Sequence, residues 1–154
     1  MHPALSFART TRLKMLAMTE SLSTEALNHI PEPLSNNLAW QLGHVTVITE
    51  ALMYLRGGIQ PERYIVGLKQ YMKGSRPEQF IPEAEITRIK TSLLSSLDEL
   101  EQTLPEQALH QTLETPFVNS FIGMTYSTLD ELLWFTSHHD MLHLGNMTAL
   151  QKMI

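Results

Sequence analysis

The sequence contains no cysteine among its 154 residues. Disulfide bridges, thiolate metal sites and a cysteine nucleophile are therefore excluded, and any metal ion must be held by histidine, aspartate, glutamate or water. Cationic residues are also few: the chain has 11 lysines and arginines and 16 acidic residues, which gives a net charge of −5. They form no basic block, which disfavours binding of nucleic acid through a positive surface.

Long apolar runs and a leader-like N-terminus are missing as well. No stretch approaches the length of a membrane span. The first five residues, Met-His-Pro-Ala-Leu, lack the charged start and apolar core of a signal peptide. With a hydrophobic share of 43%, a chain of this length can bury the core of one domain. We expect a single domain over residues 1–154, with no membrane partner and a cytoplasmic location.

Four segments carry apolar residues at helical spacing. Pro3 suits a first helical turn, Gly57-Gly58 and Pro105 end helices, and Thr128-x-x-Glu131 matches a capping box. The expected helices occupy residues 3–22, 36–57, 82–104 and 128 to near the C-terminus. The connections 59–81 and 106–126 are long, contain glycine and proline, and show no clean period. The predicted fold is all-α, a four-helix bundle with long crossover connections.

Histidines on two of these helices suggest a site. His139 and His143 are four residues apart and share one helix face, and His44 interrupts the apolar face of the second helix. If the two faces meet, three imidazoles converge as in an open, catalytic type of metal site. Alternatively, each histidine is a buried neutral imidazole with a hydrogen-bond partner and no metal. His138 points about 100° away around the helix, so we do not expect it to be a ligand.

The order His139-Asp140-x-x-His143 invites comparison with the His-Glu-x-x-His helix of zinc proteases. The comparison fails, because aspartate is shorter than the glutamate that activates water there and the third histidine lies far upstream. Asp140 is instead a candidate to cap a local network, or to orient a histidine by accepting its second N–H. Trp40, Gln41 and Asn146 lie within a helical turn of the three histidines and are pocket candidates by position.

Two motifs resemble the DinB/YfiT-like family. Residues 37–44, Asn-Leu-Ala-Trp-Gln-Leu-Gly-His, look like the family segment that carries its first histidine. Residues 139–146 resemble its C-terminal motif, His-x-x-x-His followed by x-Gly and usually glutamine. This chain has Asn146 in place of the glutamine and Asp140 in place of a frequent glutamate. The resemblance covers essentially the whole chain.

The resemblance implies a four-helix bundle, commonly a homodimer, in which His44, His139 and His143 hold a divalent ion such as zinc or nickel. Relatives use such an ion to activate a low-molecular-weight thiol in transferase or isomerase reactions, and others are described as hydrolases. Three neutral imidazoles leave the ion its full charge, so that a water or thiol bound to it loses its proton near neutral pH.

The expected function is therefore that of a metal-dependent enzyme acting on a small-molecule substrate, either a thiol-dependent S-transferase or a hydrolase. Thiol transfer is favoured slightly, because no carboxylate lies at suitable spacing to act as a general base. The alternative is a non-catalytic, dimeric stress protein that binds a metal or small ligand.

Overall fold

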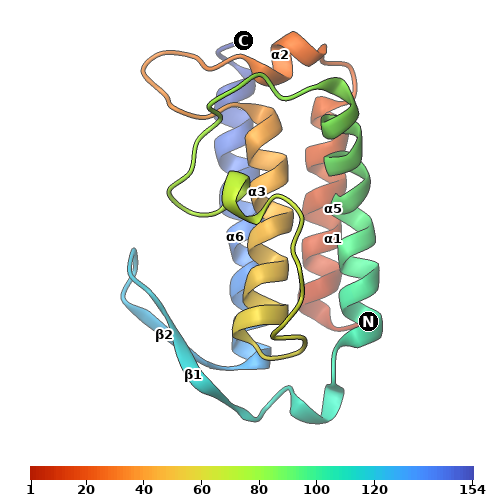
Figure 1. Ribbon diagram of the computed structural model, residues 1–154, viewed down its shortest axis with the longest axis vertical. Coiled ribbons are helices and arrows are strands. Elements are labelled where there is room, and N and C mark those ends of the chain that lie inside the picture. Colours follow the sequence, from red (N-terminus) through yellow and green to blue (C-terminus); the bar gives the residue numbers. More distant parts are fainter.

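Helices make up most of the computed structural model, which describes residues 1–154 (Figure 1). Four long helices lie side by side: α1 (Pro3–Thr19), α3 (Leu38–Glu50), α5 (Glu83–Thr103) and α6 (Leu129–Gln151). Helix α1 packs against α6 and α5, and α3 packs against the same two helices. The expectation of a mostly helical chain is confirmed. No helix has the length and apolar character needed to cross a membrane.

Side chains cap the starts of three of these helices. The side chain of His2 accepts from the Ala4 N–H at the start of α1, directly before the proline expected there. The Asn37 carboxamide accepts from the Trp40 N–H at 2.8 Å and begins α3. Thr128 and Glu131 form the predicted capping box of α6. These bonds satisfy N–H groups that the first helical turn leaves free, so the helix starts follow from local sequence.

The other helical boundaries differ from the expectation in detail. Helix α1 ends at Thr19, and a short helix α2 (Thr24–Asn28) forms in the segment expected to be only a connection. Helix α3 continues into a π-helical segment, η1 (Ala51–Arg56), before it stops at the predicted glycine pair. The connection 59–81 contains one helical turn, α4 (Leu68–Tyr71).

The connection 106–126 corrects the all-α expectation. After a 3-10 turn, η2 (Glu106–Ala108), it forms an antiparallel hairpin of β1 (Thr112–Asn119) and β2 (Met124–Thr128). These strands are rich in threonine and aromatic or β-branched residues, which fit a pleated surface. The tip turns at Gly123, whose φ of 71° suits glycine. The hairpin extends beyond the helices beside α6 (Figure 1).

The buried apolar residues of the long helices form two clusters, one toward each end. Met15, Leu42, Leu93 and Met147 belong to one cluster, and Ala8, Met53, Leu97 and Leu133 belong to the other. Along each helix, a buried polar residue lies between the members of the two clusters. These four residues, Arg12 of α1, Thr49 of α3, Ser96 of α5 and Asp140 of α6, are here called the Arg12 network.

Candidate metal centre

Three histidines meet between α3 and α6. His44 projects from α3, and His139 and His143 project from successive turns of α6. One ring nitrogen of each lies within 4.8 Å of those of the other two. The ring centroid of His44 lies 5.2 Å from that of His139 and 4.6 Å from that of His143. The structure thus brings together the three residues that the spacing and the apolar faces single out.

Hydrogen bonds fix which nitrogen faces the cluster in two of the three rings. His44 Nδ1 donates to the Tyr71 carbonyl at 2.6 Å, and His143 Nδ1 donates to the Gln41 side-chain oxygen. Both partners accept only, so both imidazoles carry their proton on Nδ1 and present a lone pair on Nε2. The Nε2 atoms of His143 and His139 are 3.1 Å apart. With its proton on Nε2, His139 donates to His143 across this distance; with its proton on Nδ1, the two Nε2 lone pairs face one another, which is the donor set that a cation requires.

Burial keeps these imidazoles uncharged. His44 is 5% exposed and His143 is 8% exposed. Burial, followed by the neighbouring imidazoles, lowers the pKa of His139 to about 2, and burial followed by His44 lowers the pKa of His143 to about 3. Burial also lowers the pKa of His44, against a smaller opposing effect of its bond to Tyr71. All three rings are neutral at pH 7, which is the form that binds a metal ion.

One buried nitrogen is left without a partner. His139 Nδ1 is buried and makes no hydrogen bond, in contrast to the Nδ1 atoms of His44 and His143. Its Nε2 has one hydrogen-bond contact, with His143 Nε2, so this histidine has no partner outside the cluster. A divalent ion between the three rings would compensate for the burial of such polar groups. The residues present therefore fit a metal ion.

Comparison with known proteins agrees with this arrangement. The family model described as DinB superfamily matches residues 8–147, which include all three histidines. The chain belongs to the DinB superfamily. No curated protein matches it. Membership in the superfamily and the histidine cluster together establish a chain that could hold a metal ion.

Trp40 and Tyr71 form the wall behind His44 in this DinB-superfamily protein. The Trp40 ring stacks on His44 at a centroid distance of 4.5 Å and an angle of 19°. Its Nε1 donates to the Gln70 carbonyl at 3.1 Å, which ties α3 to α4. Sequence reasoning chose Trp40 by position but missed Tyr71, because nothing in the irregular connection marks a residue whose backbone carbonyl orients a ligand.

The other residues considered from their sequence positions differ in whether they contact the histidine cluster. Gln41 contacts the cluster through His143. Asn146 is exposed and has no hydrogen bond to the histidines. Asp140 is fully buried, and its carboxylate bonds to Arg12, so that of the two expected roles it takes part in a local polar network and orients no histidine. His138 is exposed, lies against Trp134 and is no member of the cluster.

Two cavities border the wall but not the cluster. The larger, of about 580 Å³, is lined by Trp40, Tyr71 and the segment 75–82. The smaller, of about 270 Å³, lies against Gly43, Tyr71 and Arg63. None of the three histidines lines either cavity. A ligand in the larger cavity would therefore contact the residues that support His44 and not the ring nitrogens themselves.

A methyl group at position 43 is expected to disturb the support of His44. A Cβ on Gly43 would lie 2.7 Å from the Tyr71 ring, and the Tyr71 hydroxyl is held by Glu85 at 2.6 Å. We expect Gly43→Ala to lower the free energy of unfolding by about 1–3 kcal/mol, the usual cost of overpacking, as measured by urea denaturation.

Gly145→Ala is the matched control, since a Cβ on this helical glycine would meet no atom within 4 Å beyond its chain neighbours and the backbone of its own helix. We expect it to raise stability by about 0.5–1 kcal/mol through helix propensity. Equal effects of the two substitutions would contradict the close approach of Tyr71.

Proposed function

We propose that this protein binds a divalent metal ion, zinc or nickel, through His44, His139 and His143 and uses it to activate a low-molecular-weight thiol or a water. The single observation that carries the proposal is the convergence of three neutral imidazoles, two of them buried and that of His139 partly buried, with the Nδ1 atoms of the two buried ones bonded to acceptors. In this proposal the chain forms one DinB-like domain over residues 1–154, with its four long helices as a four-helix bundle.

The residues around the cluster would hold and orient the ligands. The Tyr71 carbonyl and the Gln41 oxygen keep His44 and His143 in the tautomer that directs Nε2 at the ion. Such partners also raise the basicity of the ligand nitrogen. Stacking on Trp40 prevents the His44 ring from turning. When bound, the ion would supply Lewis-acid chemistry that lowers the pKa of a coordinated water or thiol.

The composition of the cluster supports a thiol, ahead of water, as the group that the ion would activate. Its three members are all histidines, and the carboxylate nearest in sequence, Asp140, is engaged by Arg12. Without a carboxylate to remove a proton, the group that ionises more readily is favoured. A free thiol has a pKa of about 8.5 and bulk water one of about 15.7, which supports thiol transfer to an electrophilic small molecule ahead of hydrolysis.

A second candidate, favoured by the positions of the cavities, is a non-catalytic stress protein that binds a metal or small ligand. None of the three histidines lines either of the two cavities described above. Both candidates include a homodimer. Apolar side chains are exposed on the hairpin and on the neighbouring face of α6, which a second copy would cover: Val118, Phe121, Ile122, Met124, Met141 and Leu142. Sedimentation equilibrium measures the oligomeric state.

Metal-loaded and metal-free protein should be assayed side by side. We expect turnover of a chromogenic electrophile with cysteine or another small thiol in the zinc- or nickel-loaded protein, and its loss on chelation. Hydrolysis of a nitrophenyl ester is measured in parallel. Tight metal binding without either activity would favour the binding protein, and activity that persists in metal-free protein would exclude metal-dependent catalysis.

A further inference from the structure

A charged residue lies at the centre of the helical core. Arg12 is 0% exposed, and so is its partner Asp140, at the level where the two apolar clusters meet. A guanidinium in this position must find acceptors inside the protein, because transfer of an unpaired charge out of water is very costly. The hydrogen bonds of Arg12 therefore show which helices it links.

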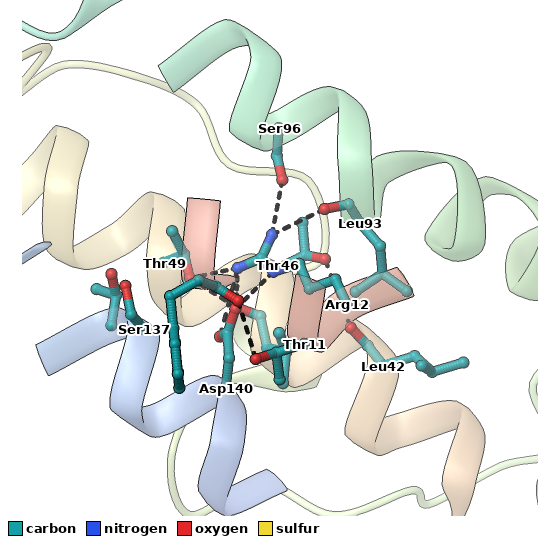
Figure 2. Close-up of polar contacts among 12 residues, drawn as sticks. Thr11, Arg12, Leu42, Thr46, Thr49, Leu93, Ser96, Ser137 and Asp140 are labelled. Atoms are coloured by element: carbon teal, nitrogen blue, oxygen red, sulfur yellow. Dashed lines mark hydrogen bonds and ion pairs between the residues drawn. The ribbon is translucent and has the colours of Figure 1, made fainter. Parts of the chain in front are cut away.

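Arg12 contacts each of the other three long helices (Figure 2). Its Nε donates to Asp140 Oδ2 of α6 at 2.7 Å, and Nη2 reaches the other carboxylate oxygen at 3.4 Å. Nη1 donates to two acceptors of α5, the Leu93 carbonyl at 3.0 Å and the Ser96 hydroxyl at 3.1 Å. Nη2 donates to Thr49 Oγ1 of α3 at 2.6 Å. The guanidinium fork is rigid and planar, so these acceptors are held in one arrangement.

The two ligand-bearing helices are among those that Arg12 joins. Its acceptor on α6, Asp140, directly follows His139 and precedes His143 by three residues. Its acceptors on α3 are Thr49 and, at 3.5 Å, the Val45 carbonyl. Val45 directly follows His44 in the sequence. Successive helical residues are turned by about 100°, so fixing Asp140 toward Arg12 also fixes the direction in which His139 and His143 point.

The network also resists sliding of the helices along one another. Shifting α6 by one turn, about 5.4 Å, would move Asp140 into an apolar cluster and leave the Arg12 charge without its partner. Metal ligation tolerates far smaller errors, since zinc–nitrogen bonds are about 2.0–2.1 Å long. The ligands come from both α3 and α6, so a metal site here requires that the rotation of α6 and its position along its axis be fixed relative to α3.

We propose that Arg12 is a positioning residue for the histidine cluster: through Asp140 and Thr49 it holds α6 and α3 in the relative placement that directs the three Nε2 atoms at one point. This inference rests on the metal site proposed above and assigns a role to residues that contact no ligand. Stability alone does not account for the pair, because buried ion pairs can often be replaced by apolar residues with little loss.

The test replaces both charges together, Arg12→Met with Asp140→Leu, so that no unpaired charge remains. The parent is first titrated with Co²⁺ and Ni²⁺. We expect the double variant to fold cooperatively, to bind both ions about 10–100-fold more weakly, the usual cost of losing outer-shell support, and to show an altered Co²⁺ visible spectrum. A parent that binds neither ion would refute the metal site itself, a result distinct from failure of the positioning role.

Two further variants complete the test. Ser137→Ala removes another buried bond between α6 and α1, that of the Ser137 hydroxyl to the Ala4 carbonyl at 2.9 Å, and should leave both affinities and the spectrum unchanged. Asp140→Asn keeps the shape of the side chain and replaces the double variant if that protein does not fold; we expect weakened binding here too. Parent-like affinity and spectrum in a folded double variant, or in Asp140→Asn, would overturn the positioning role.

Discussion

Replacing either His139 or His143 by alanine is expected to weaken binding of zinc or nickel by more than about 100-fold. Loss of an outer-shell partner already costs about 10–100-fold in metal affinity, and loss of a ligand atom costs more. Each of the three histidines offers one ligand nitrogen, so the two that remain after a substitution cannot supply the lost bond to the ion. Competition titration against a chromophoric chelator measures the dissociation constants of the two variants and the parent.

His138→Ala is the matched control on the same helix. The His138 ring is exposed and lies against Trp134 and Phe7, outside the cluster. Its removal should change the dissociation constant by less than about twofold, since helical geometry points it away from the site. An equal loss of affinity in His138→Ala, or parent-like binding in His139→Ala, would contradict the assignment of ligands.

The meeting of the three histidines could be predicted because it depends on helical periodicity. A spacing of four residues places His139 and His143 on one face, and His44 interrupts an apolar face in a helix with a clear start and stop. The buried faces of neighbouring helices pack against one another, and buried polar groups require partners. Polar residues on two such faces are therefore expected to lie in contact. The capping box at Thr128 and Glu131 is predictable for the same reason, since it is a local pattern.

Arg12 could not be predicted from local pattern. It lies between Ala8 and Met15 at helical spacing, which is the one signal that it faces the core. Arginine is nevertheless rarely buried, and its burial here depends on acceptors from three other helices. Those acceptors are far away in the sequence and carry no common motif. The buried orientation of Asp140 has the same origin, because its partner is contributed by α1.

The hairpin was missed for a related reason. Pro116 and Gly123 correctly indicate that the segment is not helical, but strand pairing depends on a partner strand and on register. The register is irregular here, since it shifts between Thr112 and Phe117. Period-2 alternation is correspondingly weak, and short β segments of this kind are stabilised by packing against other elements. In this chain Phe117 packs on Phe135 of α6 at a centroid distance of 5.1 Å.

Removal of one charge from the core is expected to have the largest effect on stability. Asp140→Leu leaves the Arg12 guanidinium buried without its counter-ion, and we expect a loss of about 3–5 kcal/mol in the free energy of unfolding. Domains are stable by about 5–15 kcal/mol in total, so this variant is close to the limit of folding. Burial raises the pKa of Asp140 to about 6, and the guanidinium of Arg12 opposes this rise by favouring the charged carboxylate.

The same substitution at Asp98 is the control, because this residue also pairs with an arginine of α1 but is 53% exposed. Asp98→Leu should cost less than about 1 kcal/mol, since water solvates the Arg9 charge that remains. Arg12→Met combined with Asp140→Leu should recover most of the stability lost in Asp140→Leu alone. Urea denaturation of the four proteins measures these differences. If the double variant were as unstable as Asp140→Leu, the pair would be required for the fold itself, and the stability of the core would depend on the same contacts that place His139 beside His44.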